Sequence, residues 1–257
     1  MDDMACADAT GVAGGAGEHL GESREGGLAL LARRLEEVRS NVRRGCEKCG
    51  RNPEDVTLIG ISKTRPASFI AAAVAAGLRD FGENYVQEAK VKAAEFPELN
   101  WHLVGHLQRN KVNAALSFVK AVHSLDSLEL IKRVDKRCVE LGTRVGGFIE
   151  VHLGGEDTKS GVEAEQLFSI LEDLRADPPQ SLCLEGLMAV PPPCVSADDN
   201  RPYFRRLREL LDEILARGYA FWRGRNLSMG MSGDYIVAIE EGATHIRVGR
   251  AIFGSRH

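Results

Sequence analysis

Between residues 56 and 249 the sequence alternates short apolar runs with longer segments of helical periodicity. The apolar runs contain few polar alternations, which is typical of parallel strands covered on both faces. We predict strands at Val56–Ser62, Asp80–Asn84, Asn100–Gly105, Ala121–Leu125, Val145–Leu153, Cys183–Val190, Asn226–Gly230 and His245–Gly249. We predict helices at Ala67–Ala76, Tyr85–Glu95, Arg109–Leu116, Ser127–Leu141, Ala164–Arg175, Arg201–Ala216 and Tyr235–Glu241. Strands that alternate with helices indicate βαβ units.

Eight such strands in about 200 residues favour an α/β fold of the closed (β/α)8 TIM-barrel type. The alternative is a doubly wound open sheet. It is disfavoured because the first strand-to-helix turn, "SKTRPAS", lacks the Gly-x-Gly-x-x-Gly fingerprint. A chain of 257 residues that is 44% hydrophobic can bury one large core. We therefore expect one barrel domain over residues 27–257, with an added helix from Leu28 to about Cys49.

The first 26 residues are rich in Gly, Ala and acidic residues and have no apolar periodicity, so we predict a disordered tail. This segment has no apolar h-region and is too acidic for a typical transit peptide, which favours the cytoplasm, with the mitochondrion as the alternative. A net charge of −4 with mixed signs argues against a nucleic-acid partner. No apolar run is long enough for a membrane span. Six cysteines in a chain of this length fit a reducing compartment.

In a barrel of this type the functional site lies at the carboxyl ends of the strands. The polar or sulfur-containing side chains expected there are Lys63, Glu83, Asn84, His106, His152, Met188 and Arg247. The loops after the seventh and eighth predicted strands, "SMGMSGD" and "RVGRA", contain small residues that let backbone amides approach an anion. These two loops form the usual phosphate site of the fold. Two tight turns without a ligand are the alternative interpretation.

Lys63 ends the first predicted strand in "LIGISKTRP". A solvated lysine is one interpretation. The other is an amine whose ammonium form is disfavoured by apolar surroundings, so that it can form a Schiff base with an aldehyde. A lysine at one end of a pocket and a phosphate site at the other together point to pyridoxal 5′-phosphate (PLP).

Several longer motifs carry a resemblance to a known family. They are "ISKTRP", "DFGENYVQEA", "WHLVGHLQRNK", "TKSGV", "GLMAVPPP", "SMGMSGDYIVAIEEGATHIRVG" and "RAIFG". From about Leu28 to His257 the chain resembles the PLP homeostasis proteins, also called PLP-binding proteins. The resemblance implies a single (β/α)8 barrel like the N-terminal domain of alanine racemase, a fold-type III arrangement. It also implies that PLP is held as an aldimine on Lys63.

The resemblance implies roles for further residues. Ser228, Ser232 and the backbone amides of Gly249 and Arg250 match positions that hold the phosphate. Arg247 matches an arginine that faces the pyridine nitrogen, and Asn84 matches a residue that lines the cofactor. We add Met188 to the expected cofactor-binding set because it lies near the carboxyl end of the sixth predicted strand, in "GLMAVPPP". No metal site and no catalytic residue are expected.

Arg247 bears on what PLP could do in such a site. PLP accelerates amino-acid chemistry when its ring nitrogen is protonated, whereas an arginine only donates hydrogen bonds. Alanine racemase adds a tyrosine from a separate C-terminal domain, and no such domain is expected in this chain. We therefore expect a PLP carrier for vitamin B6 homeostasis with little or no catalysis, acting as a monomer, with PLP-dependent apoenzymes as candidate recipients. The alternative is a fold-type III enzyme such as an amino-acid racemase, for which Tyr85 is the candidate acid or base; a partly buried packing role is the competing interpretation of that tyrosine.

Other motifs are interpreted structurally. Cys46 and Cys49 form Cys-x-x-Cys at a helix end without a second pair, so we expect two ordinary thiols. His102 and His106 flank a strand, and we do not expect them to bind a metal; His106 is a candidate for the pocket mouth. Residues 157, 159 and 160 (Asp, Lys and Ser) are interpreted as a solvated turn, and Asn200 as a helix cap.

Overall fold

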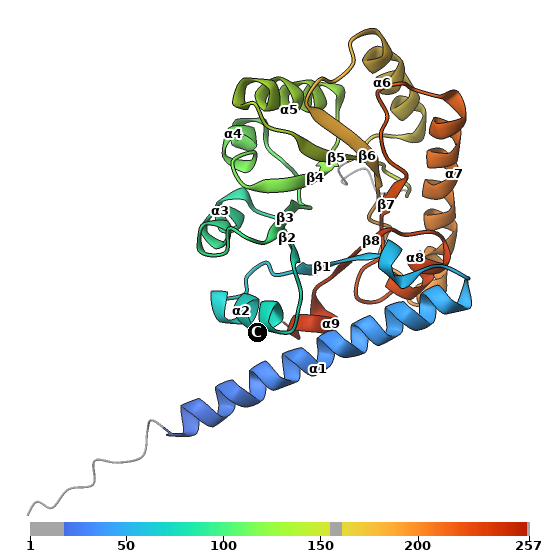
Figure 1. The fold of residues 1–257 in the computed structure, drawn as a ribbon. Coiled ribbons are helices and arrows are strands. Elements are labelled where there is room, and N and C mark those ends of the chain that lie inside the picture. Colours follow the sequence, from blue (N-terminus) through green and yellow to red (C-terminus); the bar gives the residue numbers. More distant parts are fainter. Residues whose placement is uncertain (1–17, 155–160, 256–257) are drawn as a thin grey trace, which may run out of the picture.

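The computed structural model describes residues 18–154 and 161–255 and has a closed barrel of eight parallel strands at its centre (Figure 1). Neighbouring strands follow chain order, and the last strand pairs with the first through Thr57 and His245. The strands are β1 (Thr57–Ile61), β2 (Asp80–Glu83), β3 (Asn100–Leu103), β4 (Val119–Leu125), β5 (Val145–Glu150), β6 (Leu182–Met188), β7 (Asn226–Ser228) and β8 (His245–Val248). The predicted closed barrel is confirmed, and the open-sheet alternative is wrong.

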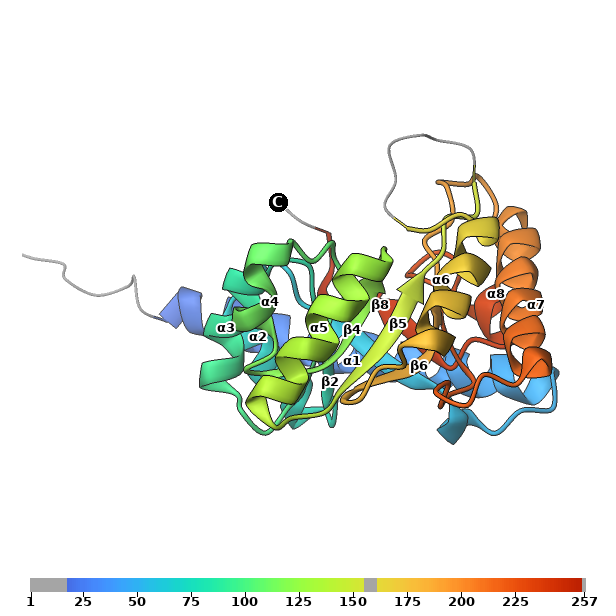
Figure 2. The ribbon, with the colours of Figure 1, turned by 90° about the horizontal axis from the view of Figure 1, so that it is seen from above.

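The helices surround the strands, as Figures 1 and 2 show from two directions. They are α2 (Ala67–Ala75), α3 (Val86–Glu95), α4 (Val112–Ala115), α5 (Leu128–Leu141), α6 (Ala164–Ala176), α7 (Arg201–Arg217), α8 (Tyr235–Glu240) and α9 (Arg250–Phe253). The helix predicted over Arg109–Leu116 is only α4, preceded by a 3₁₀ turn at Arg109–Lys111. It is short because the chain turns directly into β4, which starts at Val119 rather than Ala121.

The N-terminal helix α1 (Glu18–Lys48) lies along the outside of the barrel beside α2, α8 and α9 (Figure 1). Its buried residues Leu31, Leu35, Val38 and Val42 recur at helical spacing. Because α9 is so short, α1 supplies the apolar cover that a longer last helix would give. The helix starts at Glu18, before the predicted start at Leu28, since extending a formed helix adds one hydrogen bond per residue. Residues 1–17 of the tail predicted to be disordered lie outside the described residues. Residues 18–26, the rest of that tail, form the first part of α1.

The apolar core has two zones. The larger zone packs between the strands and the helices, and a smaller one inside the barrel contains Ala121, Phe148 and Met188. Polar rings share this interior. His123 stacks on Phe148 and His102 lies against His123, and the two histidines are 0% and 3% exposed. Among the described residues, no helix is both long and apolar enough to cross a membrane.

Glycine is required where β6 and β7 come together. A Cβ atom built on Gly186 would lie 1.9 Å from the backbone oxygen of Asn226, closer than any side chain tolerates. The two residues are also partners in the β6–β7 ladder. A residue without a side chain therefore lets the barrel close at this point.

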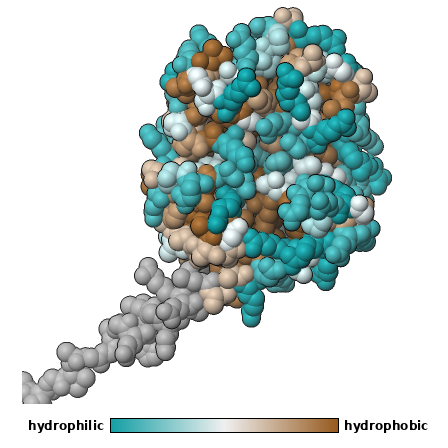
Figure 3. Space-filling model, viewed as in Figure 1, coloured by the Kyte–Doolittle hydropathy of each residue, from teal (hydrophilic) through white to brown (hydrophobic). Residues whose placement is uncertain are grey.

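The view in Figure 3 shows hydrophilic side chains over most of one face, with smaller hydrophobic areas between them. Scattered apolar side chains of this kind are normal on a protein surface.

Candidate cofactor-binding site

A cavity of about 550 Å³ opens at the carboxyl ends of β1, β6, β7 and β8. Lys63 and Arg247 both line it. Its other lining residues come from the loops after these strands and from Ile61: Val190–Val195, Ala197, Asn200, Met231–Asp234, Gly249 and Arg250. The cavity thus lies at the edge of the barrel where the strand-end rule predicts the site.

Lys63 stands in a turn whose two flanking residues are both anchored. The hydroxyl of the buried Ser62 donates to Oε1 of Glu83 at 2.7 Å. The backbone N–H of Thr64 donates to Oε1 of Glu88. Thr64 has φ of 64°, the only positive φ of a non-glycine residue in the described part of the chain. Such a conformation is unfavourable for a β-branched residue and persists only where the surroundings impose it.

Lys92 of α3 connects these anchors. Its buried ammonium donates to the carbonyl oxygen of Ser62 at 2.7 Å, to Glu83 at 2.6 Å and to Glu88 at 2.7 Å. Burial raises the pKa of Glu83, while the hydrogen bonds from Lys92 and Ser62 oppose that rise. Oε2 of Glu83 is buried without a partner among the described residues. We call Ser62, Glu83, Glu88 and Lys92 the lysine-turn cluster, because it fixes the backbone on both sides of Lys63.

Arg247 reaches the cavity from β8 with its guanidinium held at two points. Nη1 donates to Oγ of Ser228 at 2.7 Å, and Nη2 donates to the carbonyl oxygen of Ala189 at 2.9 Å. Burial lowers the pKa of Arg247 to about 10, against the opposite effects of Glu150 and Asp234. This value is still well above neutral pH, so the side chain is a fixed cation at the cavity.

Ser232 belongs to the first of the two loops predicted to bind phosphate and bonds to the second. Its hydroxyl oxygen accepts the backbone N–H of Gly249 at 3.2 Å and that of Ala251 at 3.3 Å. An oxygen atom thus already sits where two amides converge, which is the arrangement that an anionic oxygen requires. The amide and hydroxyl donors suit a phosphate at this end of the cavity.

Asn200 and Asp234 form a buried pair beside that end. Nδ2 of Asn200 donates to Oδ2 of Asp234 at 2.7 Å, and the backbone N–H of Met231 donates to Oδ1 of Asp234 at 2.6 Å. Oδ1 of Asn200 has no partner among the described residues. Asn200 occupies the N-cap position of α7, as predicted, but its side chain makes no cap hydrogen bond. Sequence analysis missed this pair, although Asp234 belongs to the "SMGMSGD" motif.

Five of the predicted site residues line the one cavity: Lys63, Ser232, Arg247, Gly249 and Arg250. Three others are not among its lining residues. Ser228 and Met188 are the last residues of β7 and β6, and both point into the barrel interior with 0% exposure. Asn84 follows β2 and packs against Gly105, where an added Cβ would meet its backbone oxygen at 2.6 Å.

The other residues singled out in the sequence lie away from the cavity or outside the described residues. Tyr85 is 65% exposed, so the partly buried packing role is wrong, and it does not line the cavity. His106 is exposed and bonds Asp126 through Nδ1 at 2.9 Å, away from the cavity lining. Cys46 and Cys49 are free thiols at the end of α1, as predicted. Residues 157, 159 and 160 lie outside the described residues. Among the described residues, no group of three or more potential metal ligands occurs.

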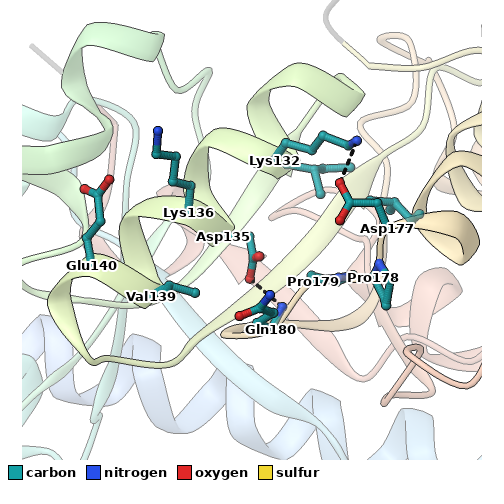
Figure 4. Close-up of a pocket in the computed structure, with 11 residues that line it drawn as sticks. Lys132, Asp135, Lys136, Val139, Glu140, Asp177, Pro178, Pro179 and Gln180 are labelled. Carbon is teal, nitrogen blue, oxygen red and sulfur yellow. Dashed lines mark hydrogen bonds and ion pairs between the residues drawn. The ribbon is translucent and has the colours of Figure 1, made fainter.

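A second groove, of about 470 Å³, lies on the outside of the barrel between α5 and the loop before β6 (Figure 4). Oδ1 of Asp135 accepts the backbone N–H groups of Gln180, Ser181 and Leu182 at 2.7–2.9 Å. Lys132 pairs with Asp177 across the groove at 2.9 Å. These side chains anchor the loop to the helix, which is a structural role.

Comparison with known proteins agrees with this fold. Residues 34–257 match the family model "Alanine racemase, N-terminal domain". An alanine racemase from Clostridium difficile superimposes with a TM-score of 0.68 at 12% identity, over 88% of this chain and 56% of that protein. These matches define the class: a (β/α)8 barrel of the alanine racemase N-terminal type.

Closer relatives define the family. A pyridoxal phosphate homeostasis protein from Aquifex aeolicus is 43% identical over 225 residues, which is 87% of this chain and 97% of the relative. PipY of Synechococcus elongatus, solved with PLP bound, is 37% identical with a TM-score of 0.77 and covers 87% of this chain and 100% of its own. The chain belongs to the family of pyridoxal phosphate homeostasis proteins.

Proposed function

We propose that this protein binds PLP in the cavity at the carboxyl ends of β1, β6, β7 and β8 and serves intracellular PLP homeostasis. The single observation that carries the proposal is the placement of Lys63, Arg247 and Ser232 around one cavity. These side chains offer an amine, a fixed cation and a hydroxyl beside two amides. PLP has an aldehyde, a ring with an acceptor nitrogen, and a phosphate, so each group has a chemically suitable counterpart.

The finer proposal is covalent attachment as an aldimine at Lys63. The neutral amine adds to the aldehyde carbon, and water leaves as the imine forms. The lysine-turn cluster supports this assignment because it holds the neighbours of Lys63 and so limits where the amine can lie. Among the described lysines, Lys63 is the one that lines the cavity.

We further propose that Arg247 contacts the pyridine nitrogen of PLP. When bound, PLP supplies an electron sink that is strongest with a protonated ring nitrogen. A cationic arginine only donates hydrogen bonds and therefore favours the unprotonated ring. This weakens the sink and supports a carrier with little or no turnover, which fits relatives named for homeostasis rather than for a reaction.

We extend the proposal to transfer of PLP to apoenzymes from a cytoplasmic monomer. Mixing the loaded protein with a PLP-dependent apoenzyme, in the presence of a trap for free PLP, would reveal direct transfer as recovered enzyme activity. Recovery that is abolished by the trap would contradict transfer.

The central test is reductive labelling. The purified protein is incubated with PLP, treated with borohydride, digested and mapped by mass spectrometry. We expect one pyridoxyl label, on Lys63, and loss of that label in Lys63→Arg, which keeps the cation but cannot form the same imine. A label elsewhere would overturn the assignment, and racemisation of alanine at enzyme-like rates would contradict the carrier role.

A further inference from the structure

A line of five polar side chains crosses the interior of the barrel and ends at the cavity. It runs from Asp80 on β2 through His102 on β3, His123 on β4 and Ser228 on β7 to Arg247 on β8. The four successive distances are 3.1, 2.9, 2.8 and 2.7 Å. The three middle members are 3%, 0% and 0% exposed. We call these five residues the interior chain.

The chemistry of the two ends fixes the direction of the first and the last hydrogen bond in the interior chain. An arginine can only donate, so Oγ of Ser228 accepts from Nη1 of Arg247. An ionised aspartate can only accept, so Nε2 of His102 carries a proton and donates it to Asp80. Burial opposes ionisation of Asp80, but the hydrogen bonds from His102 and Asn100 and the nearby charge of Lys120 together lower the pKa of Asp80, which keeps this carboxyl ionised.

The middle of the chain follows once both rings are neutral. Burial lowers the pKa of His102 and of His123, and a neutral ring has only one N–H. Nδ1 of His102 is then an acceptor for Nε2–H of His123. Nδ1 of His123 is in turn an acceptor for the hydroxyl proton of Ser228. Every donor in the chain therefore points away from the cavity, from Arg247 towards Asp80.

We propose that Ser228 and His123 are positioning residues that hold the guanidinium of Arg247 against the ring of the bound cofactor, and that Ser228 is not a phosphate contact. The proposal rests on the proposed PLP-binding function. Ser228 has one hydroxyl proton, and the interior chain assigns it to His123. Its oxygen already accepts from Arg247 beneath the cavity, whereas Ser232 is the serine beside the two loop amides.

The packing around His123 explains how the chain stays rigid. The ring stacks on Phe148 with centroids 4.2 Å apart and planes 12° apart. His245 lies edge-on to the same ring at 5.9 Å. This packing and the hydrogen bonds to His102 and Ser228 restrict rotation of the His123 ring, which favours one orientation of Arg247.

The first test needs neither a variant nor PLP. Long-range ¹H–¹⁵N correlation spectra of the labelled full-length protein report which nitrogen of each histidine carries the proton. We expect neutral Nε2–H tautomers at both His102 and His123 near neutral pH. An Nδ1–H tautomer or a charged ring at either position would overturn the inferred direction of the chain.

The second test separates positioning from phosphate binding by comparing PLP with pyridoxal, which has the same ring and aldehyde but no phosphate. If Ser228 positions Arg247, Ser228→Ala weakens both ligands by the same factor, about tenfold for a lost bond to a charged group. If Ser228 holds the phosphate, only PLP binding weakens, and the proposal fails. Unchanged binding of both ligands would also refute it.

Two further variants complete the comparison. Ser124→Ala removes another buried hydroxyl bond from β4, to the carbonyl oxygen of Gly105 at 2.7 Å, and is expected to leave both affinities unchanged. Ser228→Thr keeps the hydroxyl and is expected to restore binding of both ligands. Absence of PLP binding in the unaltered protein would refute the proposed function itself. The tautomer measurement would still decide the direction of the hydrogen bonds in the interior chain.

Discussion

Replacing Lys92 by methionine is expected to destabilise the protein far more than loss of an ordinary lysine. The side chains of Lys92 and Glu83 are 9% and 0% exposed, and the ammonium makes three hydrogen bonds within the lysine-turn cluster. Methionine fills a similar volume but leaves the Glu83 carboxyl buried without its cation. Breaking a buried pair by removing one partner costs roughly 3–5 kcal/mol.

The pH dependence of this loss has a defined sign. Burial already raises the pKa of Glu83 above its ordinary value of 4.5, and Lys92 opposes the rise, so Lys92→Met raises it further. A carboxyl with a raised pKa in the folded state contributes stability below its unfolded pKa and loses that contribution as pH rises through the folded pKa. The deficit of the variant is therefore smallest near pH 4.5 and grows towards neutral pH.

Urea unfolding monitored by circular dichroism at several pH values measures this deficit. Lys90→Met, at an exposed position of the same helix, is the matched control and is expected to change stability by less than about 0.5 kcal/mol. Adding Glu83→Gln to Lys92→Met removes the unpaired charge and is expected to recover part of the loss. An equal free energy of unfolding for Lys92→Met and Lys90→Met would refute this expectation. So would a loss of stability in Lys92→Met that does not become smaller in acid. The same variant is expected to slow PLP attachment at Lys63, as measured by reductive labelling over time.

Three further outcomes follow from the structure. Ser232→Ala is expected to weaken PLP about tenfold but pyridoxal hardly at all, and equal losses in a binding titration would contradict its phosphate role. Gly186→Ala is expected to prevent a native circular dichroism spectrum, because its Cβ would overlap Asn226, whereas Gly233→Ala has no atom within 4 Å and is expected to fold. Acid is expected to destabilise the protein through the buried rings of His102 and His123 and the partly buried ring of His245, because desolvation lowers the pKa of all three, that of His245 to about 3. Because such bases take up protons on unfolding, each one removes up to about 1.4 kcal/mol per pH unit as pH falls below 6.5, and a flat urea midpoint between pH 7 and 5 would argue against this.

The strand and helix order could be predicted because each strand is covered on both faces and each helix on one. A strand buried on both faces is an apolar run, and a helix buried on one face has apolar residues at helical spacing, so the sequence alternates between these two patterns. The limits of α1 and α4 were not predictable in the same way. The start of α1 depends on helix propagation through a Gly-containing segment, and α4 is cut short by the entry of the chain into β4.

The site could be located only as far as strand ends reveal it. Lys63 was singled out because it is a cation at the end of an apolar run and Arg247 because it lies on the last predicted strand, but the role expected of Arg247 came from the family resemblance. Ser228 and Ser232 could not be told apart, since both are serines of "SMGMS" and only the end of β7 decides which one faces the barrel interior. Asn200 and Lys92 gave no signal, because their importance comes from partners brought close by the tertiary fold.

The polar groups that the sequence did not reveal share one feature, and it explains why this barrel tolerates them. Buried charges and rings destabilise a core unless they are paired, yet the lysine-turn cluster and the interior chain each pair their members by side-chain hydrogen bonds. Each network also ends at a residue of the cavity, the first on the backbone flanking Lys63 and the second on the guanidinium of Arg247. An apolar interior of the same volume would be as well packed but would hold neither the backbone beside Lys63 nor the guanidinium of Arg247. The two networks are therefore best understood as the structural requirement for presenting an amine and a fixed cation to one ligand at the same time.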